Sequence, residues 1–172
     1  MTEILQYEHE TLRGKASPVA QADFGTPKLR EIIARMSEAL ALQDDGVAIA
    51  APQIGLPIRM FVVSGKVLRK KKDGTQASDR AFINPEIINT SKKKEWMEEG
   101  CLSVRWLYGE VERYTKATVR AQDENGKFFT LGGGKLLSQI YQHETDHLNG
   151  MVFVHRLGWW KRRKIFSKLE RK

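Results

Sequence analysis

The chain of 172 residues has the length of one ordinary domain; 41% of its residues are hydrophobic and 29% are charged, which excludes a wholly disordered protein. Its single cysteine, Cys101, excludes a disulfide scaffold and favours a reducing compartment. No apolar run approaches the ~18 residues of a membrane helix. The N-terminal segment carries three glutamates and no basic residue before Arg13, unlike a secretory or transit peptide. We therefore predict a cytoplasmic protein without a membrane span.

The positive charge is concentrated near the C-terminus. The whole chain has 29 basic and 21 acidic residues, a formal net charge of +8. Residues 155–172 contain eight basic residues and one acidic residue, whereas residues 1–154 contain 21 basic and 20 acidic residues. A protein that binds nucleic acid over its whole surface is excluded by this distribution. We predict a nearly neutral body, residues 1–154, followed by a basic appendage, residues 155–172, that contacts a polyanion.

The first predicted helix begins at Thr26-Pro27. Threonine can cap a free backbone N–H, and proline lacks the N–H that the first helical turn leaves unpaired. Hydrophobic residues then recur at helical spacing as far as Leu40. We expect this helix to reach about Gln43 and to end in the turn Asp44-Asp45-Gly46.

Short apolar or alternating segments predict the strands. The strongest hairpin signal is Asn125-Gly126, which lies between two such segments. The basic run from Lys66 to Lys72 is predicted to be a solvated loop, and residues 132–134, three glycines, are predicted to end the last strand. The predicted strands are residues 59–64, 81–88, 94–97, 115–122 and 128–131.

The second predicted helix carries Leu136, Ile140, His143 and His147 on one stripe and stops at Asn149-Gly150. Strands outnumber helices and do not alternate with them as βαβ units. We therefore predict a single α+β domain, with mixed or antiparallel sheets around this central helix and a basic helix at the C-terminus.

Residues 143–147 form the motif H-E-x-x-H on the second predicted helix. Histidines four positions apart project from the same helical face and can bind one metal ion, while Glu144 is offset and can act on water without being a ligand. A chance match is the alternative. Two bare imidazoles on the inner face of a helix would, however, be costly unless their nitrogens were satisfied, which favours a metal.

A hydrolytic metal site keeps three protein ligands and one open position, so a third ligand is required. Two candidates remain open from the residues alone. His155 lies downstream, beyond the predicted helix stop, and Cys101 lies upstream. Cys101 could also be a small buried residue or the nucleophile of a cysteine hydrolase, although the nucleophile interpretation leaves Glu144 and the histidine pair without a role.

Three ordered motifs give the chain a resemblance to the peptide deformylase family. Residues 46–53 read GVAIAAPQ, similar to the family's G-φ-G-φ-A-A-x-Q. Residues 99–103 read EGCLS, and residues 142–150 read QHETDHLNG, similar to Q-H-E-x-D-H-L-x-G. Residues 83–86, INPE, also look like the family, and the likeness extends over about residues 4–153.

The resemblance implies removal of formate from peptides that begin with N-formylmethionine. It implies that Cys101, His143 and His147 are the ligands of one divalent metal, with Glu144 as the general acid and base. The metal is expected to be Fe(II) in the cell, with Zn(II), Ni(II) or Co(II) as substitutes. The oxyanion donors are the side-chain amide of Gln53 and the backbone N–H of Leu102.

The family's substrate-binding positions are apolar or small here. The alternative for the apolar ones is plain core packing, and a pairing of Asp146 with Arg113 close to the metal is a further hypothesis. The expected substrate-binding residues are Gly46, Val47, Ala48, Met97, Gly100, Leu136 and Ile140.

Two positions depart from the family pattern. Ala48 stands where the family usually has glycine, so alanine would be strained if φ were positive there. Arg105-Trp106 stands where the family usually has proline-glycine, next to the oxyanion segment. Because the ligand positions, Glu144 and Gln53 are intact, we expect an active enzyme.

Residues 158–172 can form an amphipathic helix with Trp159, Ile165, Phe166 and Leu169 on one side. We expect it to pack on the body and to contact the ribosome through ribosomal RNA, in preference to lying on a membrane. The protein is expected to be a monomer. Two other functions remain: a general metallopeptidase, and a metal-stabilised RNA-binding module without activity.

Overall fold

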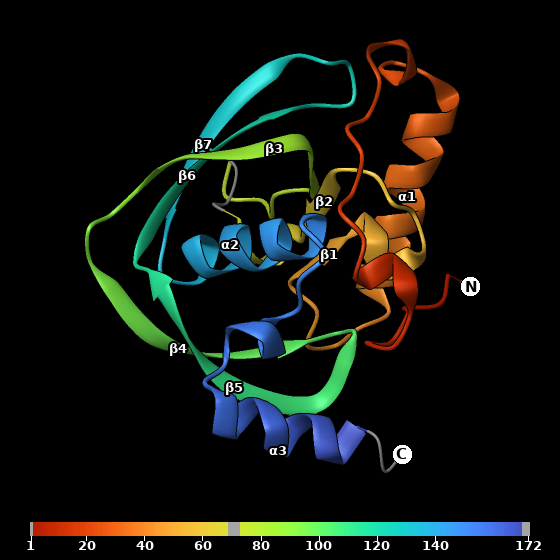
Figure 1. Ribbon diagram of the computed structural model, residues 1–172. Coiled ribbons are helices and arrows are strands. Elements are labelled where there is room, and N and C mark those ends of the chain that lie inside the picture. Colours follow the sequence, from red (N-terminus) through yellow and green to blue (C-terminus); the bar gives the residue numbers. More distant parts are fainter. Residues whose placement is uncertain (1, 69–72, 170–172) are drawn as a thin grey trace.

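A five-stranded antiparallel sheet curves around a central helix, α2, Leu136–Leu148 (Figure 1). The computed structural model describes residues 2–68 and 73–169. The strand order is β1-β2-β3-β6-β7, and each neighbouring pair is antiparallel. The strands are β1, Ala48–Ala50; β2, Met60–Val63; β3, Arg80–Thr90; β6, Lys116–Gln122; and β7, Phe128–Gly134.

A separate two-stranded hairpin closes the other side of α2 (Figure 1). Its strands are β4, Lys94–Cys101, and β5, Val104–Tyr114. The sequence predicts only the first half of β4 and none of β5. Charged residues occur on both faces of β5, Glu110 and Glu112 on one and Arg113 on the other, so the strand lacks the clean alternation that marks a half-buried strand.

The side chains of β1 and β2 point alternately to two helices, so this part of the sheet lies between α2 and α1. Phe61 and Val63 join one buried cluster with Tyr141 and Leu148 of α2. Met60, Val62 and Ile49 join a second cluster with residues of helix α1, Pro27–Ala41. Because successive side chains of a strand point to opposite faces, four consecutive apolar residues in β2 are all buried, half against each helix.

The predicted start of α1 and the predicted stop of α2 are confirmed, and α1 ends at Ala41, two residues before the expected Gln43. The Thr26 hydroxyl accepts a hydrogen bond from the Leu29 N–H at 3.3 Å at the start of α1, and Gly150, in a left-handed conformation with φ +74°, follows the end of α2. Gly126, with φ +81°, lies in the turn between β6 and β7. The prediction that the glycines of residues 132–134 end the last strand is wrong, since β7 continues to Gly134 and pairs with β6 throughout.

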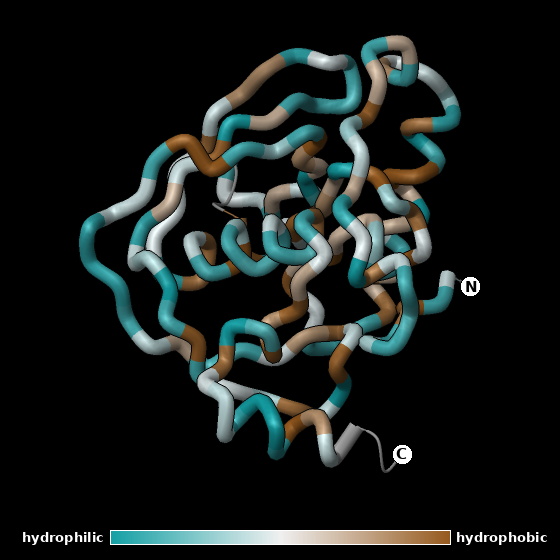
Figure 2. Tube along the Cα trace, viewed as in Figure 1, coloured by the Kyte–Doolittle hydropathy of each residue, from teal (hydrophilic) through white to brown (hydrophobic). Residues whose placement is uncertain are grey.

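The helix α3, Trp159–Leu169, lies along the β4–β5 hairpin (Figure 1). Along it, the hydrophilic run of residues 161–164 is followed by the hydrophobic pair Ile165 and Phe166 (Figure 2). Ile165 is buried with Val111 of β5, and the ring of Phe166 lies 5.1 Å from that of Tyr7. Trp159, expected on the packed face, is exposed.

Parts of two predictions fall outside the described residues. They are residues 69–72 of the basic loop and residues 170–172 of the tail. None of the helices in the described ranges is both long and apolar enough to span a membrane. The division of the chain at residue 154 stays a prediction.

Candidate metal centre and cavity

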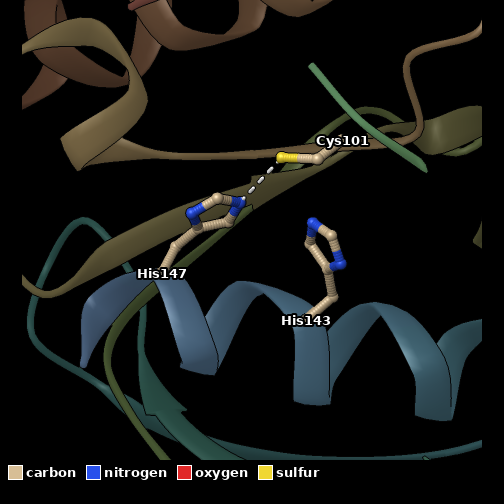
Figure 3. A group of neighbouring side chains, drawn as sticks. All are labelled: Cys101, His143 and His147. Atoms are coloured by element: carbon tan, nitrogen blue, oxygen red, sulfur yellow. Dashed lines mark hydrogen bonds between the residues drawn. The ribbon is translucent and has the colours of Figure 1, made fainter. Parts of the chain in front are cut away.

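Two elements bring three metal-binding side chains together. His143 and His147 lie one turn apart on α2, with ring centroids 5.0 Å apart, and Cys101 lies at the end of β4. One ligand atom from each residue lies within 4.8 Å of the others. Figure 3 shows both imidazoles extending from α2 towards the thiol. Of the two candidates for a third ligand, the geometry therefore favours Cys101.

His155, the other candidate, lies in a short 3-10 helix, Phe153–Arg156, and takes no part in this group. Its Nδ1 accepts a hydrogen bond from the Val152 N–H at 3.0 Å. Burial is the main reason that the pKa of His155 is lowered. Its role is therefore local, in the turn that follows α2.

The three side chains fit a divalent metal ion. The Sγ of Cys101 lies 3.2 Å from Nε2 of His147. His147 is buried, and burial lowers the pKa of its imidazole, which favours the neutral form that binds metals. One thiolate and two imidazoles suit zinc, ferrous iron, cobalt or nickel, and they leave a coordination position open.

A buried ionic network contacts the Nδ1 side of the His143 imidazole. Nδ1 of His143 lies 3.0 Å from Oε2 of Glu99, which leaves Nε2 free to face the other ligands. Arg113 donates two hydrogen bonds to Glu99, at 2.7 and 3.0 Å, and one to Asp146 at 2.8 Å. Arg156 donates two more to Asp146. The hypothesised contact between Asp146 and Arg113 is confirmed.

Opposing influences act on the pKa of Glu99. Burial by itself raises this pKa, but hydrogen bonds from His143 and Arg113 outweigh it and hold the pKa at about 2. Glu99 therefore carries a negative charge that orients His143 and neutralises Arg113. Sequence reasoning missed this role and that of Arg156. The only signal was the place of Glu99 in the motif that contains Cys101.

Glu144 lies beside the ligands without joining them. Its side chain is buried, and its Oε2 has no hydrogen-bond partner among the described residues. Burial is the main reason that the pKa of Glu144 is raised, to about 7; His143 lowers it, and the charges of Glu99 and Asp146 raise it. A carboxyl group with such a pKa can accept and return a proton near neutral pH.

The amide of Gln53 is fixed by the backbone. The N–H of Ala50 donates to Oε1 of Gln53 at 2.8 Å, so the NH₂ group faces the opposite way. There Nε2 lies 3.1 Å from the Ser103 hydroxyl and 3.7 Å from the Cys101 sulfur. A donor is thus aimed at the region of the ligands. Leu102 follows Cys101 in the tight turn between β4 and β5, where the predicted backbone donor would lie.

A cavity of about 330 Å³ opens in front of these groups. Most of the predicted substrate-binding residues line it: Gly46, Val47, Ala48, Gly100, Leu136 and Ile140. Met97 is the exception, because it lies in β4 outside the lining, opposite Val111 of β5. The lining also contains residues that the sequence did not single out as substrate-binding, among them Arg105, Trp106, Leu107, Tyr108 and Gln139.

Comparison with known proteins identifies the family. A family model described as "Polypeptide deformylase" matches residues 1–163. The chain belongs to the polypeptide deformylase family. "Peptide deformylase 1" of Burkholderia multivorans is 39% identical to it over 168 residues, which make up 98% of this chain and 87% of that relative.

Solved structures agree with this assignment. A peptide deformylase from Legionella pneumophila superposes with a TM-score of 0.85 and 36% identity, over 99% of this chain and 94% of that chain. A class I type b peptide deformylase from Acinetobacter baumannii, bound to Met-Ala-Ser, superposes with a TM-score of 0.79 and 31% identity, over 91% of this chain and all of that one (100%).

This deformylase is an enzyme that removes the N-formyl group from nascent peptides, and its family depends on a metal. The general metallopeptidase and the inactive RNA-binding module are thereby set aside. Strain at Ala48 is not found, because this residue is absent from the few with positive φ, whereas Trp106 has φ +65°. The strained backbone of the site therefore lies at the second departure from the family pattern.

Proposed function

We propose that this deformylase holds one divalent metal on Cys101, His143 and His147 and uses Glu144 as its acid and base. The observation that carries the proposal is the meeting of the three ligand side chains beside a cavity that Cys101, His143 and Glu144 line. We propose Fe(II) as the metal in the cell, with zinc, nickel or cobalt as substitutes, since the thiolate and imidazole ligands suit all four. When bound, the metal would supply Lewis acidity, which polarises a carbonyl group and activates water near neutral pH.

The proton is moved by Glu144. Its Oε2, which has no hydrogen-bond partner in the described part of the chain, accepts a proton from the attacking water and returns it to the nitrogen of the departing amine. Because the carboxyl is buried, few other groups compete for that proton.

Negative charge on the formyl oxygen is stabilised by Gln53 and by the backbone N–H of Leu102. Gln53 is supported in this role because Ala50 fixes the orientation of its amide before substrate arrives. A donor that is already in place requires no reorganisation during the reaction, and the loss of one such donor typically lowers the rate ~10²–10³-fold.

The methionine side chain of the substrate enters the apolar part of the cavity, at Val47, Leu136 and Ile140. Gly46, Ala48 and Gly100 line the same cavity and are proposed to lie along the peptide backbone. The solved relative that holds Met-Ala-Ser supports a peptide of this kind as the ligand. Met97 is not proposed for the pocket, given its place outside the lining.

The protein is proposed to act as a monomer and to contact ribosomal RNA through α3. Arg162, Arg163 and Lys164 are exposed there, next to the exposed rings of Trp159 and Trp160. Basic side chains on one exposed helix are suited to phosphate groups.

Formate release tests the catalytic assignments. Anaerobically purified, iron-loaded protein is expected to release formate from formyl-Met-Ala-Ser and to leave unformylated Met-Ala-Ser intact. The Glu144→Ala variant should bind metal equally but lose about 10²–10⁴-fold in kcat, the usual contribution of a general acid or base. Glu95→Ala, at an exposed glutamate of β4 outside the cavity, is the matched control. A Glu144→Ala variant with the wild-type rate would contradict the proposal.

A further inference from the structure

A bulge in the β4–β5 hairpin places a tryptophan at the mouth of the cavity. Cys101 pairs with Val104 and Gly100 pairs with Tyr108, so residues 105–107 of β5 have no partners in β4. Trp106, in the middle of this bulge, has φ +65°. A left-handed conformation is unfavourable for a bulky side chain and persists only where the surrounding structure imposes it.

Trp106 belongs to an apolar rim. Its side chain is 72% exposed, those of Tyr108 and Leu136 are 56% and 47% exposed, and all three line the cavity. The Tyr108 ring covers Gly100, since a Cβ at that position would lie 2.7 Å from Cε1 of Tyr108. Large aromatic groups exposed together at the edge of a ligand cavity indicate a contact surface for apolar groups.

The bulge is tied to the opposite side of the cavity mouth. Arg105 forms an ion pair with Asp45 at 3.3 Å and a hydrogen bond with the side chain of Gln43, both in the segment between α1 and β1. The guanidinium carbon of Arg105 also lies 5.8 Å from the centre of the Trp106 ring. The tryptophan is therefore held at the mouth by its neighbour.

We propose that Trp106 is a specificity-determining residue that packs against a large apolar or aromatic side chain in the second or third position of the formylated peptide. This inference rests on the proposed function, in which the formyl group lies at Glu144 and the methionine side chain fills the apolar part of the cavity. The following residues of the peptide then leave through the mouth, where the rim is aromatic. The large, flat ring of the tryptophan offers a contact surface to the peptide, at the cost of a strained backbone at φ +65°.

Two peptide series test the proposal with the full chain. The series are formyl-Met-X-Ser and formyl-Met-Ala-X, with alanine or phenylalanine at X. We expect the wild type to prefer phenylalanine over alanine in at least one series by about 3- to 10-fold in kcat/KM, the scale of one aromatic contact. The preference should be expressed in KM, because this contact forms equally in the ground state and the transition state.

Variants of the tryptophan separate the ring from the backbone. Trp106→Ala and Trp106→Gly should both abolish the preference for phenylalanine, and Trp106→Phe should retain most of it. Trp106→Gly should also melt at a higher temperature, because glycine removes the strain at φ +65°. Trp96→Ala, at another exposed tryptophan of the same hairpin outside the cavity, is the matched control and should keep the preference.

The outcomes distinguish this inference from the proposed function. Formate release from every peptide without any preference for phenylalanine, or a preference that survives in Trp106→Ala, would overturn the role of Trp106 alone. No release from any peptide by the metal-loaded wild type would instead overturn the proposed function.

Discussion

Glu99 connects His143, a proposed metal ligand, to the buried side chain of Arg113. It is 4% exposed and contacts both His143 and Arg113. A carboxylate behind an imidazole fixes the orientation of the ring and strengthens its metal-binding nitrogen. The same carboxylate balances a guanidinium group that is itself buried. A change at this position therefore acts on metal binding and on folding together.

The Glu99→Gln variant should bind metal about 10- to 100-fold more weakly, since contacts of this kind typically contribute that much to metal affinity. It should also unfold more easily, by about 3–5 kcal/mol, because Arg113 is left as a buried charge with one partner fewer. Chelator competition measures the first effect, and urea denaturation of the metal-free protein measures the second.

Glu112→Gln provides the control for Glu99→Gln. Glu112 precedes Arg113 in β5, but its side chain is exposed and pairs with Lys94 at the surface at 3.3 Å. Exposed ion pairs contribute about 0–1 kcal/mol, so this variant should bind metal like the wild type. Equal metal affinity in Glu99→Gln and Glu112→Gln would show that Glu99 does not position His143.

At the scale of the elements, the end of α2 fixes the position of His147. The N–H groups of Gly150 and Met151 donate to the carbonyls of His147 and Asp146, at 3.1 and 2.9 Å, which closes the helix directly after the ligand. The N-terminal segment packs over this closure, because the Ala16 N–H donates to the Leu148 carbonyl at 3.0 Å. Helix end and N-terminal segment therefore support each other.

Gly150→Ala should destabilise the protein by about 2–5 kcal/mol, from the left-handed conformation and from overpacking together. The added Cβ would lie 2.4 Å from the Arg13 carbonyl oxygen, at a backbone with φ +74°. Thermal or urea unfolding measures the loss. Gly158→Ala is the matched control, since a Cβ there meets nothing within 4 Å, and its effect should stay within about 0.5 kcal/mol. Equal stability of the two variants would contradict this account of the helix end.

The elements that the sequence predicts well are those with local signals. Thr26-Pro27 and Asn149-Gly150 mark helix ends through the chemistry of single residues, and hydrophobic spacing predicts the helical faces. Strand β5 carries no such signal, because charged residues occur on both of its faces and hide the alternation of a half-buried strand. Strand β1, only three residues long and buried on both faces, has no alternation to detect.

The candidate site divides in the same way. The histidine pair and Glu144 follow from the spacing of one helix, whereas Cys101 is preferred to His155 only through the family resemblance of residues 99–103. Contacts between segments far apart in the sequence could not be predicted from it, apart from the hypothesised pair of Asp146 with Arg113. The bonds of Glu99 to His143 and Arg113 span 44 and 14 positions, and the ring of Trp106 reaches the cavity only through the bulge.

At the scale of the whole molecule, the basic helix α3 packs directly on the hairpin that lines the cavity. The hairpin that supplies Cys101 also carries α3, through the packing of Ile165 on Val111 and a surface ion pair of Lys161 with Glu110 at 3.0 Å. Because α3 packs on a hairpin that lines the cavity, any partner bound to α3 would lie close to the cavity. Ribosomal RNA is the polyanion expected near a nascent peptide, and the contact predicts a clear dependence on salt.

Co-sedimentation with ribosomes tests this contact in the full chain. Replacing Arg162, Arg163 and Lys164 with glutamine should weaken binding at low salt and reduce the slope of log K against log salt by about 2–3, since each phosphate contact contributes ~0.7–0.9. Formate release from a free tripeptide should not change, because these exposed side chains lie outside the cavity.

A matched triple variant distinguishes a local contact from an effect of net charge. Lys28, Arg30 and Arg35 are exposed basic residues of α1, a helix on another side of the molecule, and their replacement with glutamine removes the same charge (Figure 1). If α3 is the docking element, this control should bind ribosomes like the wild type. Equal weakening by both triple variants would mean that ribosomes respond only to total charge. Binding of the wild type to anionic vesicles in preference to ribosomes would assign α3 to a membrane surface instead.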